Sequence, residues 1–118
     1  MTWRTVFCET DAGERPVWDF IMGLGEKDQA KVTRALDLLE ELGLELRAPH
    51  VRSIRGRRKL WELRVKGVGG ADRLLYFAFT DRQMVILHAF VKKTRKTPPR
   101  EIATAERRMN DFLERLGE

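Results

Sequence analysis

The chain is poor in the features that mark several large classes of protein. It has a single cysteine, Cys8, which rules out an internal disulfide and a cysteine-based zinc site. No apolar run approaches the roughly 18–20 residues that span a bilayer, and the N-terminus shows no signal-peptide pattern. We therefore expect a cytoplasmic protein with no membrane partner. Cys8 lies in an apolar run, where a buried small hydrophobe is favoured over a nucleophile.

Histidine is also scarce. Only His50 and His88 are present, so the sequence does not offer the pair of histidines with which some ribonucleases transfer protons. His88 lies in an apolar strand pattern, where a buried, hydrogen-bonded histidine is favoured over an acid–base role near neutral pH. His50 follows Pro49 and is interpreted as a loop residue. Trp61 and Tyr76 stand among apolar neighbours and are expected to pack in the core.

The chain has enough apolar sequence for one folded domain. With 42% apolar residues among 118, residues 1–118 are expected to form a single domain with a substantial core. Apolar residues recur with helical spacing in 17–24, 32–42 and 102–116, and with strand character in 3–9, 60–66, 73–79 and 84–91. Pro16 suits a first helical turn, and residues 80–83 suit a hairpin turn. The resulting order, βααβββα, predicts an α+β fold with a mainly antiparallel twisted sheet packed on helices.

Positive charge is concentrated in two segments. The net charge is +5, yet residues 52–73 carry eight Lys and Arg against two acids, and residues 92–100 carry five against none. Since these segments hold +6 and +5, the rest of the chain carries −6. A basic site on an otherwise acidic body is typical of a face that binds a polyanion. A merely solvated surface would instead scatter both signs along each element.

The second basic segment continues directly from an apolar strand. Residues 88–91 lead into four cations, and two prolines follow: Lys92, Lys93, Arg95, Lys96, Pro98 and Pro99. Four cations in five residues repel one another unless a polyanion lies among them. Because they are attached to a core strand, they predict a rigid phosphate site and hence a nucleic-acid ligand.

Cations from the two preceding strands can reach the same place. Strand periodicity puts Arg64 and Lys66 on one face with Glu62 beside them, and Arg73 begins the next strand. Three neighbouring strands can thus surround one phosphate with Arg64, Lys66, Arg73, and Lys92 or Lys93. Such a group could hold a phosphate and stabilise negative charge on its oxygens. Glu62 either orients one of these cations or forms a structural ion pair.

The same segments carry a resemblance to a known group of proteins. It rests on LWELRVKG at 60–67, Arg73 with the LLYF that follows, HAFVKKTRKTP at 88–98 and EIATAERR at 101–108. With the two leading helices, these blocks resemble the RelE/HigB superfamily of bacterial type II toxins, most closely its HigB-like, phage-associated branch. The resemblance covers essentially the whole chain. It implies a RelE-like fold and an endoribonuclease that enters the ribosomal A site and cleaves mRNA there, for which we expect neither metal nor cofactor. It also implies a cognate antitoxin, usually a helix-turn-helix protein in this branch, that relieves the inhibition of translation.

The resemblance suggests roles for individual residues. Arg73 matches the arginine that opens the family's central strand, and would clamp the scissile phosphate. Arg64 and Lys66 occupy basic strand positions and would stabilise the transition state. Either Lys92 or Lys93 would assist the leaving group, and one lysine with a lowered pKa could act as general base. Family members often have a tyrosine or histidine near the start of the last helix. Here that segment reads TPPREIATA at 97–105, which leaves the general acid unassigned.

A second basic run precedes the strand at 60–66. Arg55, Arg57, Arg58 and Lys59 are interpreted as contacts with ribosomal RNA phosphates, and Arg95 and Lys96 as further phosphate-positioning residues. Two other classes of function stay open at this point. The same scaffold could be a non-catalytic nucleic-acid-binding module, or its cationic face could dock an acidic protein segment without meeting RNA.

Overall fold

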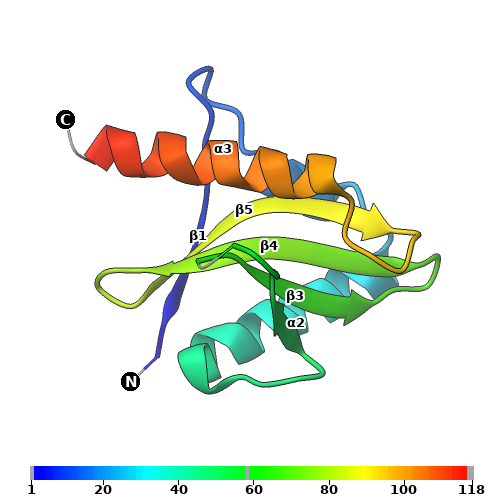
Figure 1. Ribbon diagram of the computed structural model, residues 1–118. Coiled ribbons are helices and arrows are strands. Elements are labelled where there is room, and N and C mark those ends of the chain that lie inside the picture. The colour runs from blue at the N-terminus through cyan, green and yellow to red at the C-terminus, as the bar shows by residue number, and fades with distance from the viewer. Residues whose placement is uncertain (1, 58, 117–118) are drawn as a thin grey trace.

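The computed structural model describes residues 2–57 and 59–116 (Figure 1). Its strands are β1 (Arg4–Phe7), β2 (Val51–Ser53), β3 (Trp61–Lys66), β4 (Ala71–Phe79) and β5 (Gln83–Lys92). Its helices are α1 (Pro16–Met22), α2 (Glu26–Leu42) and α3 (Pro99–Leu116), with a 3₁₀ turn, η1, at Gly43–Glu45. Within this part of the chain, three α-helices and one five-stranded sheet form the α+β fold that the sequence predicts. None of the helices described is long and apolar enough to cross a membrane.

The strands lie in the order β1–β5–β4–β3–β2. β3, β4 and β5 form an antiparallel meander, β2 adds a short antiparallel pairing with β3, and β1 runs parallel to β5. The mainly antiparallel sheet is therefore confirmed, and the parallel edge strand makes it mixed. The sequence does not predict β2, because three residues between a proline loop and an arginine-rich turn are too short to show periodicity.

Local sequence explains where several elements begin and end. Pro16 occupies the first turn of α1, where its missing N–H costs nothing. α2 ends at Gly43, whose φ is +53°, and a Cβ at this position would overlap the Trp3 ring. The β4–β5 turn places Asp81 and Arg82 at φ values of +57° and +56°, which match the twist of a two-residue hairpin.

Helices cover both faces of the sheet, with α2 on one side and α3 on the other (Figure 1). One core lies between α1, α2 and the face that carries Leu63 and Leu74. The second core lies between α3 and the face that carries Leu75 and Phe77. Because side chains alternate along a strand, each strand residue is assigned to one of these two faces.

The predicted core residues are confirmed. Cys8 is buried, and its thiol donates to the Leu87 carbonyl (3.2 Å). Burial raises the pKa of the Cys8 thiol, as expected for an inert, buried cysteine. Tyr76 is buried in the core beside α2, and burial raises the pKa of its hydroxyl. Trp61 packs partly buried against the same core.

α3 covers only part of its face of the sheet. Ile102 and Phe112 pack on the second core, and Phe112 meets Phe79 near the β4–β5 turn (ring centroids 5.3 Å apart). Toward the other end of β3, the same face carries Arg64, which is half-buried, and Lys66, which is exposed. This open end of the sheet, beside the β3–β4 turn, positions the candidate site.

Candidate functional site

Strand register arranges most of the predicted catalytic residues in three rows across the open end of the sheet. The first row is Lys66, Ala71 and Lys92; the second is Arg64, Arg73 and Phe90; the third is Arg52, Glu62, Leu75 and His88. Directly opposed residues have their side chains on the same face of a sheet. Four of the five predicted catalytic residues therefore share one surface: Arg64, Lys66, Arg73 and Lys92.

Ala71 leaves a gap in the first row. Its methyl group lies between the long cationic side chains of Lys66 and Lys92, which come from strands about 10 Å apart, since each strand spacing is about 4.8 Å. Arg64 and Arg73 lie in the adjacent row. A phosphate above Ala71 would thus meet cations on both sides and along one edge. We call this space the phosphate gap.

A buried carboxylate lies beside these cations. The Glu62 side chain is 1% exposed, and its Oε1 lies 3.5 Å from Arg73 Nε and 4.0 Å from Arg64 Nε. Its Oε2 accepts a hydrogen bond of 2.5 Å from the Thr97 hydroxyl, in the loop that follows β5. Glu62 therefore balances part of the positive charge and ties β3 to that loop.

Arg73 is held from several sides. Its side chain is only 10% exposed, and its Nη1 donates to the carbonyls of Asp72 (3.1 Å) and Val65 (3.5 Å). Among the residues described, Arg73 Nε makes no hydrogen bond, so its contact with Glu62 is an ion pair without a directed N–H. Burial lowers the pKa of Arg73 and Glu62 opposes this, but a guanidinium stays charged in proteins. Arg73 thus supplies positive potential mainly from beneath the surface.

The structure separates Lys92 from Lys93. Lys92 is the last residue of β5, is half-buried and belongs to the first row. Burial is the main cause that lowers the pKa of Lys92; Glu62 opposes it, and the guanidinium groups of Arg73 and Arg64 reinforce it. Lys93 follows the strand, is exposed and belongs to none of the three rows. Of the two lysines, Lys92 is the one that borders the phosphate gap.

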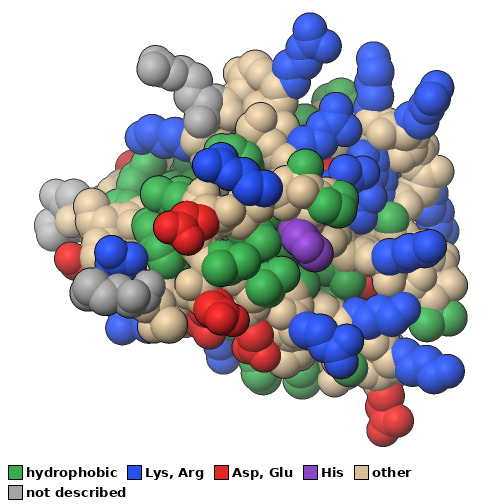
Figure 2. Space-filling view, turned by 90° about the horizontal axis from the view of Figure 1, so that it is seen from below, with side chains coloured by type: hydrophobic (Ala, Val, Ile, Leu, Met, Phe, Trp, Pro, Cys, Tyr) green, Lys and Arg blue, Asp and Glu red, His purple; other side chains and the backbone are tan. Residues whose placement is uncertain are grey.

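Two hollows flank the rows. One, of about 490 Å³, is lined by Pro49, His50, Arg64, Lys66, Ala71 and Arg73. The other, of about 260 Å³, lies between β2 and the loop after β5, and its lining includes Arg52, Arg55, Glu62, Lys92, Arg95 and Lys96. In Figure 2, Lys and Arg side chains crowd the right-hand side of the molecule, the side on which β3 and β5 end in Figure 1. The cations thus surround recessed spaces rather than a flat patch.

The run at 55–59 lies beside the smaller hollow. Arg55 lines that hollow. Arg57 is exposed, and its Nε lies 3.4 Å from Glu106 Oε2 in α3. Lys59 is exposed, and Arg58 lies outside the described residues. The run therefore divides between the candidate site and a surface ion pair with α3.

Sequence reasoning misses three residues of this surface. Ala71 has no functional group, and a gap becomes visible only once its neighbours across the sheet are known. Thr97 lies 35 positions from its partner Glu62. His50 is a loop residue, as predicted, but the Arg64 N–H donates to its carbonyl (2.8 Å), which places it at the edge of the second row. Had the sequence predicted β2 at 51–53, His50 would have been recognised as the residue that precedes a strand next to Arg64.

His88 lies under the first turns of α3. Its Nε2 is 2.8 Å from Glu101 Oε1, and its Nδ1 is 3.1 Å from Arg108 Nη1. Because a guanidinium only donates, Nδ1 accepts and the ring proton is assigned to Nε2, toward the carboxylate. Burial lowers the pKa of His88, its hydrogen bond to the Glu101 carboxylate raises it, and the charge of Arg108 lowers it. The predicted hydrogen-bonded strand histidine is confirmed, and both of its nitrogens are engaged.

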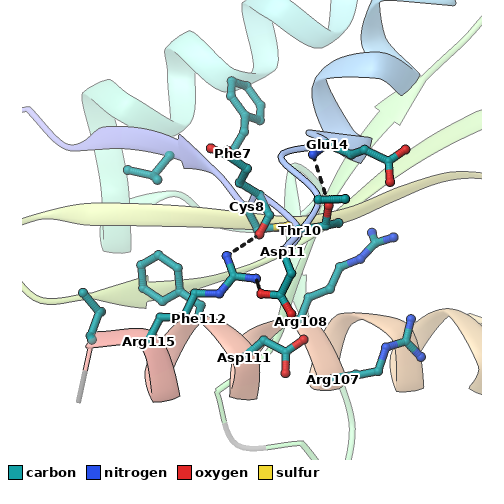
Figure 3. Close-up of a pocket in the computed structure, with 14 residues that line it drawn as sticks. Phe7, Cys8, Thr10, Asp11, Glu14, Arg107, Arg108, Asp111, Phe112 and Arg115 are labelled. Atoms are coloured by element: carbon teal, nitrogen blue, oxygen red, sulfur yellow. Dashed lines mark hydrogen bonds and ion pairs between the residues drawn. The ribbon is translucent and has the colours of Figure 1, made fainter. Parts of the chain in front are cut away.

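A larger hollow lies at the opposite edge of the sheet, between β1, the loop that follows it and α3 (Figure 3). It measures about 560 Å³ and has charges of both signs around it. Arg115 donates to the Glu9 carbonyl (2.8 Å) and pairs with Asp11, while Arg108 donates to the Leu87 carbonyl (3.0 Å). These two guanidinium groups are engaged within the protein, so this hollow does not resemble the phosphate gap.

Metal-ligating side chains do not gather in a comparable way. Over residues 2–57 and 59–116, no group of three or more His, Cys, Asp or Glu side chains is arranged to hold a metal ion. The groups that converge are cations, which suit an anionic ligand.

Comparison with known proteins identifies the family. No curated protein matches the chain by sequence. The model of a family described as Phage derived protein Gp49-like (DUF891) matches residues 19–110. The match runs from α1 into α3 and includes all three rows of the candidate site. This is a family of RelE-like type II toxins, which implies an antitoxin partner. Since the match covers well over half of the chain, the protein belongs to the Gp49-like family of phage-derived proteins, a family of RelE-like type II toxins.

Proposed function

We propose that this protein is the toxin of a type II toxin–antitoxin system and a HigB-like, ribosome-dependent endoribonuclease that cleaves mRNA in the ribosomal A site. The observation that carries the proposal is the phosphate gap, in which Lys66 and Lys92 flank Ala71 with Arg64 and Arg73 alongside. Preorganised cations of this kind stabilise the charge that develops on phosphorus when a 2′-hydroxyl attacks. Family membership supports the toxin–antitoxin part.

Lys92 is suited to assist the leaving group. It borders the phosphate gap as an ammonium, and burial lowers the pKa of Lys92. It therefore gives up a proton more readily than an exposed lysine would. In this proposal, Lys92 protonates the 5′-oxygen as that oxygen leaves phosphorus. Glu62 keeps the neighbouring guanidinium groups in place without entering the reaction.

The cations outside the phosphate gap hold the toxin on RNA. The smaller hollow beside the site is lined by Arg55, Arg95 and Lys96. Lys59, four residues after Arg55 in the sequence, is exposed. Contacts of this type are made to phosphates, depend on salt and do not read bases. A cognate antitoxin, expected to be a helix-turn-helix protein, would neutralise the toxin by covering this cationic end of the sheet.

The proposal is tested with Lys66→Ala and Lys92→Met, because both side chains are accessible. Arg73 is less suitable, since its buried ion pair makes unfolding a competing cause of lost activity. Induction of the wild-type protein in a bacterium should arrest growth, and translating ribosomes in a purified system should show cleaved mRNA. Each substitution should slow cleavage on the order of 100-fold, as expected for loss of one transition-state donor or proton donor.

Arg4→Ala provides the matched control. Arg4 is exposed on β1 and pairs with Gln83 beside the β4–β5 turn, so this variant loses the same charge at the opposite end of the sheet and should cleave at the wild-type rate. RNA binding without cleavage by the wild-type protein would contradict the nuclease and favour a non-catalytic binding module. No RNA affinity even at low salt would favour a protein-interaction role.

A further inference from the structure

We propose that His50 is the general base of this site and takes the proton from the attacking 2′-hydroxyl, on the opposite side of the phosphate from Lys92. The inference rests on the proposed function and deepens it. It supplies a proton acceptor from a residue that the sequence places in an ordinary loop.

His50 extends the second row across the sheet. β2 is antiparallel to β3, with Arg52 opposite Glu62, and the Arg64 N–H donates to the His50 carbonyl (2.8 Å). Continuing this pairing by two residues puts His50 opposite Arg64, and therefore on the same face of the sheet. His50 also lines the hollow of about 490 Å³ that reaches Ala71. Its imidazole thus borders the space in which a phosphate would lie.

The His50 ring is available for proton transfer. The residue is exposed, and its described hydrogen bonds are made by its main chain, whose N–H donates to the Arg47 carbonyl (3.1 Å). The charged groups that share its hollow are Arg64 and Lys66 from β3 and Arg73 from β4, and no acid lines that hollow among the residues described. The cations would hold the phosphate. Guanidinium and ammonium groups only donate, so among the residues that line this hollow the His50 imidazole is the side chain that can accept a proton.

His50 and Lys92 flank the phosphate gap from opposite sides. His50 precedes edge strand β2, Lys92 ends β5, and β3 and β4 lie between them. In-line displacement at phosphorus needs a proton acceptor beside the attacking oxygen and a proton donor beside the leaving oxygen. The order of the strands therefore places the proton acceptor, His50, and the proton donor, Lys92, on opposite sides of the phosphate gap, as in-line displacement requires.

The step balances in atoms and charge. The 2′-oxygen gives its proton to the His50 ring and forms a bond to phosphorus. The bond between phosphorus and the 5′-oxygen breaks, and that oxygen takes a proton from Lys92 Nζ. The products are a 2′,3′-cyclic phosphate and a 5′-hydroxyl end. The imidazolium then releases its proton to water and the lysine amine takes one up.

The test is single-turnover cleavage of mRNA on translating ribosomes, measured across about pH 5.5–8.5, the range in which histidines titrate. His50→Gln should slow cleavage on the order of 100-fold. The rise in rate with pH that a neutral imidazole base produces should also disappear. In His50→Ala, free imidazole should restore part of the rate. Because His50 is exposed, both variants should keep the wild-type melting temperature.

His88→Gln is the matched control. His88 is the other histidine of the chain, and both of its ring nitrogens are bound within the protein. At equal folded fraction, this variant should keep the pH dependence and gain nothing from imidazole. A wild-type rate in His50→Ala, or a slower rate with unchanged pH dependence and no imidazole effect, overturns the inference and leaves the nuclease standing. Failure of the wild-type protein to cleave mRNA overturns both proposals.

Discussion

Glu62→Gln should destabilise the protein strongly, because it removes the charge of a buried carboxylate and almost none of its volume. The Glu62 side chain is 1% exposed and lies 3.5 Å from Arg73 Nε. The Arg73 side chain is itself only 10% exposed, so water cannot replace the lost partner. The Thr97 hydroxyl, which donates to Glu62, can still donate to an amide oxygen. The loss of charge is therefore the main effect.

The structure sets the expected size of this effect. Removing one partner of a buried ion pair costs about 3–5 kcal/mol, because the remaining charge stays in a medium of low dielectric. Arg64 adds little, because its side chain is 35% exposed and water screens its charge. For a chain of 118 residues, 1 kcal/mol corresponds to about 4 °C in Tm. Glu62→Gln should therefore lower Tm by about 12–20 °C.

Urea unfolding, followed by the fluorescence of the three tryptophans, measures the free energy directly. Glu106→Gln is the matched control, since it breaks a 3.4 Å pair with a half-exposed Arg57 and should cost less than about 1 kcal/mol. The double variant Glu62→Gln/Arg73→Met removes both charges together. Its loss of unfolding free energy should therefore be smaller than the sum of the two single losses, by more than about 1 kcal/mol. If Glu62→Gln costs no more than Glu106→Gln, or if the single changes simply add, the reasoning about buried charge is wrong.

Three further predictions concern stability and use the same unfolding measurement. Gly67→Ala should cost about 1–3 kcal/mol, because a Cβ there would lie 2.8 Å from the Gly70 carbonyl oxygen and 2.9 Å from Asp72 Oδ2, whereas Gly69→Ala, with nothing within 4 Å of the added atom, should cost much less. Asp72→Asn should stabilise the protein at neutral pH, because burial and then Asp28 raise the pKa of the Asp72 carboxyl above 3.8. On acidification, the Asp72 carboxyl is therefore protonated in the folded protein before it is protonated in the unfolded chain. The difference in free energy of unfolding between wild type and Asp72→Asn should narrow as pH falls, and a constant difference would contradict this. Burial lowers the pKa of His88 below 6.5, so on acidification His88 is protonated in the unfolded chain before it is protonated in the folded protein. The free energy of unfolding of the wild-type protein should therefore fall, relative to that of His88→Gln, as pH drops below 6.5. Parallel stability curves for these two proteins would rule out that account of His88.

Much of the fold can be predicted from the sequence, because repeating apolar positions report which face of an element is buried. The helical spacing in 32–42 and 102–116 and the near-continuous apolar run at 73–79 give elements that the structure confirms as α2, α3 and β4. The confirmed positions of Cys8 and Tyr76 follow from their apolar neighbours. β2 cannot be predicted in this way, because its three residues are too few to show a repeating pattern of apolar positions.

The candidate site is predictable in kind but not in geometry. Period-two alternation is a property of a single strand, so it correctly groups Arg64 with Lys66. It cannot give the pairing between strands, which depends on hairpin length and bulges; β4 and β5 shift register beside Leu75. The choice of Lys92 over Lys93 at the phosphate gap follows from that register.

By itself, the sequence determined most of the secondary structure and the concentration of cations in 52–73 and 92–100, from which a polyanionic ligand is predicted. These are local properties, set by side-chain type and spacing along the chain. Only the tertiary structure decided that Ala71 separates two lysines, that Glu62 lies buried among guanidinium groups, and that His50 reaches the same hollow. The physical reason is that each of these relations joins strands that are distant in the chain, and such relations are created by the hydrogen-bonded register of the sheet.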